Sequence, residues 1–188
     1  MSEQTDEIKS IKEGIEETLS KNFIDNMETV KREMNMLNVL LNSFDGVEYT
    51  YDEYCRGRMK YELEACDKVV KIDFEEEYKM TNQETAIIQN RASLKYNSNP
   101  DGDFEDLYKE EWIKWQVEKS IMIDKKIFYP VSRYSSLKLL EDKLPKEVWE
   151  EKRSYFENIC DKKAKDAAEV IANNNKDYHE EKIRVENM

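Results

Sequence analysis

Apolar residues recur at helical spacing along the first 44 residues of the chain. From Phe23 to Phe44 they alternate between three and four residues apart, which places them on one face of a helix, as in a coiled-coil seam. This apolar stripe consists of Phe23, Met27, Val30, Met34, Leu37, Leu41 and Phe44. The pattern continues upstream through Ile8, Ile11, Ile15 and Leu19. It predicts a single helix over residues 6–44, with a length of roughly 58 Å.

The apolar stripe is too large to be left in water. Exposing its seven side chains would forgo roughly 10 kcal/mol of apolar burial, at about 1.5 kcal/mol each. The helix must therefore either pack along several others or meet a second chain, and the function that we predict takes the cover to be a second copy of the chain or a helix of a partner protein.

Short-range signals mark several helix ends. Gly46 is expected to close the first helix, because glycine readily takes the left-handed conformation found at helix C-termini. Thr50 with Glu53, and Thr81 with Glu84, have the spacing of a capping box, and each pair predicts a helix start.

The second helix is predicted to run from Tyr51 toward Tyr78. Within it, Val70, Ile72 and Phe74 alternate with polar residues. A short strand over residues 68–74 therefore remains an alternative.

The second half of the chain has clear breaks. Residues 97–103 consist only of Asn, Ser, Pro, Asp and Gly, which predicts a loop, with Asp103 capping the next helix. Pro130 disfavours helix at the preceding residue and predicts an extended segment over residues 127–131. Pro145 suits the first turn of a last long helix, which the asparagines at 173–175 interrupt.

Composition supports an all-α fold. The 188 residues include only four Gly and three Pro, fewer than the turns of a sheet protein require. We predict a long, coiled-coil-like N-terminal helix packed on, or projecting from, a bundle of about four to six helices. The expected segments are the N-terminal helix (1–46), the second and following helices (47–97), a helical body (98–175) and a charged tail (176–188).

Charge narrows the choice of partners. The formal net charge is −12, and such a surface repels phosphate backbones, so direct nucleic-acid binding is disfavoured. The same charge suits an acidic inhibitor that mimics nucleic acid and occupies the groove of a nucleic-acid-binding protein, as phage-encoded antagonists do.

Several features favour a cytoplasmic location. The three cysteines, Cys55, Cys66 and Cys160, have neither disulfide-framework nor zinc-site spacing and are expected to be reduced thiols. The polar, acidic N-terminus is unlike a signal peptide, and no apolar run approaches the roughly 18 residues of a membrane span.

Chemical motifs are sparse. The single histidine, His179, lies in the charged tail, where we expect a surface residue and not a catalytic base. Glycine-rich phosphate loops are absent from the sequence. We therefore expect no catalytic residues, no cofactor, no metal and no small-molecule substrate.

Paired acids suggest one enzymatic alternative. Glu13-Gly-Ile-Glu16 and Glu64-Ala-Cys-Asp67 resemble the acidic motifs of all-α nucleotide pyrophosphohydrolases, although they lie further apart than that family's pattern allows. The resemblance implies a Mg²⁺-dependent nucleotide hydrolase.

One basic cluster lies in the second predicted helix. It could grip an acidic partner or a phosphate. Alternatively, it forms helical i,i+4 ion pairs with neighbouring acids, which is the interpretation that we favour. The cluster comprises Arg56, Arg58 and Lys60, and the acids are Asp52, Glu62 and Glu64.

The function predicted from these observations is protein binding without catalysis. The apolar stripe would pair with a partner helix or with itself. Trp112 and Trp115 share a helix face and either pack in the core or anchor a partner, because tryptophan is enriched at binding hot spots. The predicted partner-binding residues are therefore the seven members of the stripe together with these two tryptophans.

Overall fold

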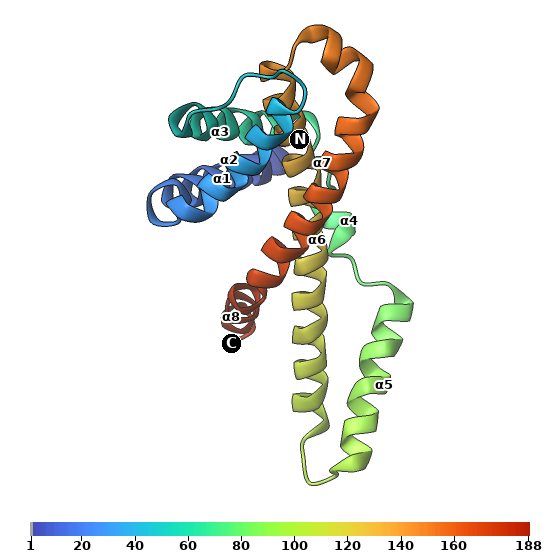
Figure 1. The fold of residues 1–188 in the computed structure, drawn as a ribbon. Helices are drawn as coiled ribbons and strands as arrows, with labels where there is room; N and C mark the ends of the chain where they lie inside the picture. Colours follow the sequence, from blue (N-terminus) through green and yellow to red (C-terminus); the bar gives the residue numbers. More distant parts are fainter. Residues whose placement is uncertain (1) are drawn as a thin grey trace. The chain divides into compact units, whose positions relative to one another are not determined.

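The computed structural model describes residues 2–188, with side chains from residue 5 onward. In this part of the chain every regular element is a helix, which confirms the all-α class (Figure 1). The helices are α1 (Ser2–Asp25), α2 (Met27–Asn42), α3 (Tyr51–Lys68), α4 (Phe74–Glu77), α5 (Asn82–Ser98), α6 (Phe104–Lys143), α7 (Lys146–Asn174) and α8 (Lys176–Glu186). None of these described helices is long and apolar enough to cross a membrane.

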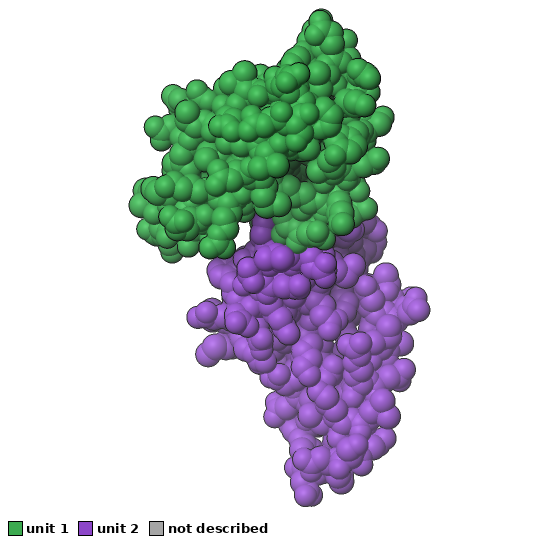
Figure 2. All heavy atoms as spheres, in the orientation of Figure 1, with its two compact units in different colours: residues 1–71, 127–168 green, residues 72–126, 169–188 purple. Residues whose placement is uncertain are grey.

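The chain divides into two compact units, each assembled from two separated segments (Figure 2). Unit 1 comprises residues 1–71 and 127–168, and unit 2 comprises residues 72–126 and 169–188. Helices α6 and α7 each contribute residues to both units. The predicted segments follow chain order, whereas each observed unit joins stretches that are distant in sequence.

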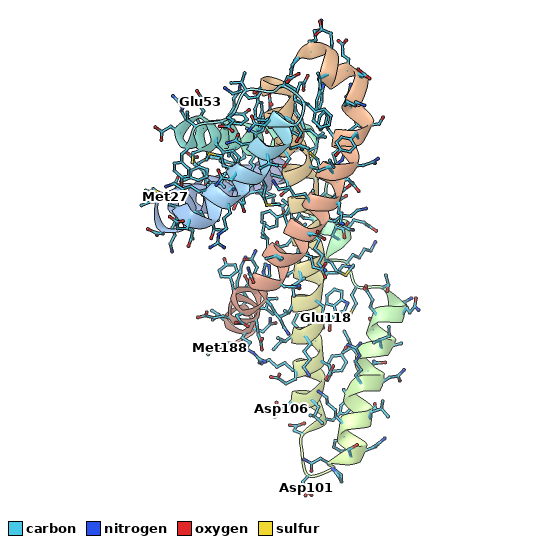
Figure 3. All side chains as sticks on the ribbon, in the orientation of Figure 1. Met27, Glu53, Asp101, Asp106, Glu118 and Met188 are labelled. Atoms are coloured by element: carbon cyan, nitrogen blue, oxygen red, sulfur yellow. The ribbon has the colours of Figure 1, made fainter. Side chains whose placement is uncertain are left out.

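The N-terminal region forms two helices, so the prediction of a single rod over residues 6–44 was wrong. Asn26, with φ −117° and ψ 35°, separates α1 from α2, and Met27 begins α2 at the bend (Figure 3). Both helices are hydrogen-bonded to α3 or to the residues that immediately precede it. The Tyr51 hydroxyl donates to the Phe23 carbonyl at 2.6 Å, and the Asn38 side chain holds both backbone groups of Tyr49, at 2.8 and 3.1 Å. The break allows each piece to contact α3 separately.

The apolar stripe is covered by the chain itself. Val30, Leu37 and Leu41 are buried in the core of unit 1, and Leu41 is 0% exposed. This cluster also contains Leu140 of α6 and Phe156 of α7. Within unit 1 the stripe therefore already has the burial that we expected a second chain to provide. Phe23, Met34 and Phe44 pack against the same cluster, and Met27 is 39% exposed.

The end of α2 differs from the prediction in which residue is left-handed. Asp45, with φ 58°, adopts this conformation, and Gly46 does not. The Gly46 amide donates to the Leu41 carbonyl at 2.7 Å, the 6→1 bond of a Schellman ending. A Cβ at Gly46 would lie 2.9 Å from that carbonyl oxygen, so glycine is needed for close approach.

Both predicted caps start helices. Thr81 and Glu84 form the complete capping box, with bonds of 3.1 and 3.0 Å. Thr50 accepts from the Glu53 amide at 3.3 Å, but the Glu53 carboxylate contacts Lys143 at 3.1 Å instead of returning to the cap. Here a contact between distant residues replaced the second half of a local motif.

The second helix ends earlier than predicted. α3 stops at Lys68, and after an irregular stretch the short α4 occupies residues 74–77. The strand alternative over residues 68–74 is also wrong. Asp73 begins the new turn by accepting from the Glu76 amide at 3.1 Å. This stretch contains the boundary between the two units, so α3 does not continue into unit 2.

Helix α6 continues through Pro130, which contradicts the extended segment predicted there. A proline inside a helix costs about 3 kcal/mol. Val131 and Ile127, which flank it, are 1% and 5% exposed, and burial of each contributes about 1.5–3 kcal/mol. Core packing therefore offsets the missing hydrogen bond. By contrast, the loop that contains Asp101 was predicted correctly (Figure 3), as was the interruption before α8.

Candidate functional site

The larger of two described hollows is a groove in unit 2, with a volume of about 490 Å³. This volume falls within the range of ligand sites, roughly 300–1,000 Å³. Its walls come from the segment after α4, from one face of α6 and from α8. We call it the tryptophan groove, and its lining residues are Tyr78, Met80, Trp112, Trp115, Gln116, Ser120, His179, Lys182, Ile183 and Glu186.

Two predicted binding residues lie together in this groove. Trp112 and Trp115 are three residues apart on α6 and are both partly buried. Helix α8 lies against the same part of α6, where Ile183 joins Ile113 and Val117 in a small buried cluster. Both tryptophans are only partly buried, so part of each indole is accessible from the groove. Their role as partner anchors stays a prediction.

Charged hydrogen bonds hold α8, which forms one edge of the groove, against α6. Arg184 donates two hydrogen bonds to the Glu110 carboxylate, at 2.8 and 3.1 Å, and a third to Glu180 at 3.1 Å. The hydrogen bonds from Arg184 hold the pKa of Glu110 below its ordinary value. This forked geometry fixes the side chains more tightly than a single contact would. Helices α8 and α6 are distant in sequence, so no short connection fixes their relative position. The contacts between Arg184 and Glu110 therefore help to hold this wall of the groove in place.

On its other side, α6 contacts α5, which lies beside it in unit 2 (Figure 1). Lys119 Nζ lies 3.5 Å from Glu84 of α5. The same ammonium lies 5.9 Å from the Trp115 ring centroid, within cation–π range. Lys119 therefore links the helix pair to the groove.

His179 lies in the tryptophan groove, so the prediction of a surface residue was wrong. Its Nε2 is 2.6 Å from Asp124 Oδ2, and the two side chains are 16% and 15% exposed. Asn175 also donates to that oxygen, at 3.4 Å. The residues around His179 in the sequence gave only a weak indication that it would line a groove. His179 and Ile183 are four residues apart and share the face of α8 that meets α6.

The histidine–aspartate pair does not extend to a nucleophile. Ser120 also lines the groove, but its hydroxyl is bonded to Tyr78 at 3.2 Å and has no bond to His179. A serine triad requires the serine–histidine hydrogen bond, because the histidine takes the serine proton. In this structure His179 and Ser120 are therefore each bonded to a different partner, Asp124 and Tyr78.

Acidic residues accompany the aromatic lining. Glu186 lines the groove, and the exposed Glu75 and Glu76 come shortly before Tyr78 in sequence. Lys182 is the one lysine among the described lining residues. The whole chain carries a net charge of −12. Lys182 and Glu186 balance each other within the lining, so an attraction for positively charged ligands would come from the net charge of the whole chain.

The two predicted sets of binding residues occupy different units. The tryptophans belong to unit 2, whereas the apolar stripe belongs to unit 1, where most of it contributes to the core.

Two of the four acids that resemble a hydrolase motif are engaged in ordinary pairs, and the other two, Glu13 and Glu16, are exposed. Asp67 contacts Lys12 at 2.5 Å, and Glu64 accepts from Tyr134 at 2.7 Å and Lys68 at 3.1 Å. In the part of the chain that the structure describes, no three His, Cys, Asp or Glu side chains are grouped to hold a metal ion.

Comparisons with known proteins identify no relative: no protein-family model, curated protein or solved structure matches this chain.

Proposed function

We propose that this protein is a non-enzymatic interaction module that binds a segment of a partner protein in the tryptophan groove. The observation that supports this proposal is a hollow of about 490 Å³ with two partly buried tryptophans on one helix face. Tryptophan supplies large, rigid contact area, and it is enriched at the centres of binding interfaces.

The groove suits a segment with one bulky apolar side chain. Trp112, Trp115, Met80 and Ile183 offer apolar contact. The amide of Gln116 and the ring of His179 provide hydrogen-bonding groups beside them, which can orient a bound backbone. An aliphatic or aromatic anchor surrounded by such groups is a common mode of peptide recognition.

Charge favours a basic partner segment. The protein is strongly acidic, and Glu186 stands at the groove itself. Lysine or arginine flanking the apolar anchor would therefore accelerate association and make binding sensitive to salt. Self-pairing through the apolar stripe is not part of this proposal, because the core of unit 1 uses that surface.

A peptide library displayed on phage tests the proposal directly. Peptides would be selected on the wild-type chain and counter-selected on the Trp112→Ala/Trp115→Ala variant. We expect enriched peptides to combine one aromatic or aliphatic residue with neighbouring Lys or Arg. Their affinity for the wild-type chain and for each variant would be measured by isothermal titration calorimetry, because the double alanine variant lacks the groove tryptophans that a fluorescence signal would need.

A matched control separates the groove from the rest of the molecule. Trp149 packs in unit 1, stacked on Phe156 with ring centroids 5.9 Å apart, and its replacement by Phe should leave peptide affinity unchanged. Loss of both groove indoles should weaken binding by about 2–4 kcal/mol, or roughly 30-fold to 1,000-fold. Peptides that bind the double alanine variant equally well, or a selection that enriches none, would refute the proposal.

A further inference from the structure

A second hollow lies inside unit 1, between α2, α3, α6 and α7, with a volume of about 60 Å³. Helix bundles commonly build ligand sites in such interior positions, from side chains on facing helices. We call it the inner polar pocket. Its lining residues are Glu33, Tyr54, Arg58, Glu62, Ser132, Ser135, Ser136, Leu139, Lys163 and Ala167.

Glu62 has an unsatisfied oxygen at this pocket. The residue is 8% exposed, and its Oε2 atom is buried with no hydrogen-bond partner. Arg58 Nε lies 3.6 Å away, which is an ion-pair contact but is longer than a hydrogen bond. Burial raises the pKa of Glu62. An unsatisfied buried acceptor costs about 1–3 kcal/mol, so a donor bound at this atom would remove a cost to folding.

The neighbouring arginine already has a partner. Arg58 forms an ion pair with Glu33 of α2 in addition to its longer contact with Glu62. The contact with Glu62 confirms one of the i,i+4 pairs predicted for the basic cluster. Because Arg58 is shared between Glu33 and Glu62 and is too distant to donate to Glu62, the Oε2 atom of Glu62 is the acceptor at the pocket that lacks a hydrogen-bond donor.

Lys163 provides an unmatched charge of opposite sign. It lines the same pocket from α7, and no carboxylate oxygen lies within 4.0 Å of its Nζ among the side chains of residues 5–188. Burial lowers the pKa of Lys163. Glu62 and Lys163 attract each other at a distance without direct contact. Small side chains, Ser132, Ser135 and Ala167, leave space between the helices.

We propose that the inner polar pocket binds the headgroup of a free α-amino acid. Its ammonium group would donate to Glu62 Oε2, and its carboxylate would accept from Lys163 and from the Ser135 hydroxyl. A zwitterion supplies a donor to Glu62 Oε2 and an acceptor to Lys163 at once. A simple anion would leave Glu62 Oε2 without a donor, and a simple cation would leave Lys163 without an acceptor and be repelled by it.

The volume agrees with a ligand of this size. A water molecule in the liquid occupies about 30 Å³, and a cavity of about 150 Å³ can hold benzene. A pocket of about 60 Å³ therefore exceeds one water and accommodates a few non-hydrogen atoms of a headgroup. Glu33, whose side chain is 36% exposed, lies at the more open part of the lining, where an amino-acid side chain would leave the pocket.

Isothermal titration calorimetry of the full-length chain tests the proposal, with glycine and L-alanine as probes. Acetate and methylammonium each carry half of the headgroup and should bind at least about tenfold more weakly than glycine. Glu62→Gln and Lys163→Met should each reduce glycine affinity by about tenfold or more, because each removes a charge-assisted hydrogen bond. Lys165→Met is the matched control on α7, since Lys165 pairs with Asp161 at 3.0 Å outside the pocket.

Circular dichroism would verify that each variant stays folded. Glu62→Gln replaces a buried charge with a neutral group of the same shape, so it is expected to fold. If Lys163→Met unfolds, Glu62→Gln and the comparison of glycine with its two halves still decide the question. Absence of saturable glycine binding up to about 10 mM would refute the proposal. Equal glycine binding to wild type and to Glu62→Gln would also refute it, because the glycine would then bind without the pocket's unsatisfied acceptor.

Discussion

Replacing Leu41 with alanine distinguishes a core role for the apolar stripe from an interface role. Leu41 is 0% exposed and belongs to the buried cluster of unit 1. Truncating a fully buried leucine typically costs 2–5 kcal/mol, from lost transfer energy and the cavity left behind. We expect a loss of about 3 kcal/mol in the unfolding free energy of unit 1. The matched control is Val39→Ala on the same helix, because Val39 is 68% exposed and should change stability by less than about 0.5 kcal/mol.

Urea unfolding measures this difference, with Trp149 as the reporter for unit 1. Trp149 packs against the cluster that contains Leu41, and Trp112→Phe/Trp115→Phe would remove the signal from unit 2. With a urea slope of about 2–3 kcal/mol/M, the expected loss moves the midpoint by about 1–1.5 M. The midpoint should not depend on protein concentration, because the partner surface of Leu41 is its own chain.

The interface interpretation predicts a different outcome. Under it, Leu41→Ala would leave the unfolding midpoint of the isolated chain close to that of Val39→Ala. Light scattering would instead show a concentration-dependent oligomer that the substitution dissociates. That pair of results would refute the assignment of the stripe to the core.

Three further predictions address local features. Asp45→Gly should raise the thermal midpoint of unit 1, by about 1 kcal/mol of stability, because Asp45 adopts a left-handed conformation that glycine reaches without strain; an unchanged or lower midpoint would contradict this. Gly57→Ala should destabilise unit 1 by up to about 2 kcal/mol, because the added Cβ would lie 2.8 Å from the buried Leu139 Cδ2 atom, and the cost of displacing that side chain is only partly offset by the higher helix propensity of alanine; a urea midpoint equal to or above wild type would show that the Leu139 side chain moves aside at little cost. The Arg184 contact depresses the pKa of Glu110, so its stabilising effect is present above the ordinary glutamate pKa and is lost as pH falls through the depressed value. The urea midpoint of unit 2 should therefore fall more steeply at acidic pH in wild type than in Arg184→Gln, and parallel profiles would contradict the linkage.

Signals that act over a few residues were read correctly from the sequence. The capping box at Thr81 and the interruption at Asn175 occur in the structure, and the loop predicted over residues 97–103 occurs over residues 99–103. Each depends on hydrogen bonds or backbone preferences within about four residues, so neighbouring residues suffice to specify it. The alternation of threes and fours in the apolar stripe likewise identified which face of the N-terminal region is buried.

The predictions that the structure contradicts have a different physical origin. The break at Asn26, the early end of α3 and the helical path through Pro130 all depend on packing against residues distant in sequence. Local preferences of a few kcal/mol or less are outweighed when several side chains become buried together. His179 shows the same for the candidate site, because its partner Asp124 lies on another helix and the sequence does not reveal their approach.

The amino-acid sequence by itself determined that this chain is helical, which faces of its helices are apolar, and where several of those helices begin. Tertiary structure alone decided what covers those faces, because periodicity identifies a surface that must leave water but not the surface that it meets. For the apolar stripe the covering surface proved to be the chain's own α3, α6 and α7. For Trp112 and Trp115, only the return of α8 onto α6 created the groove in which we propose that a partner binds.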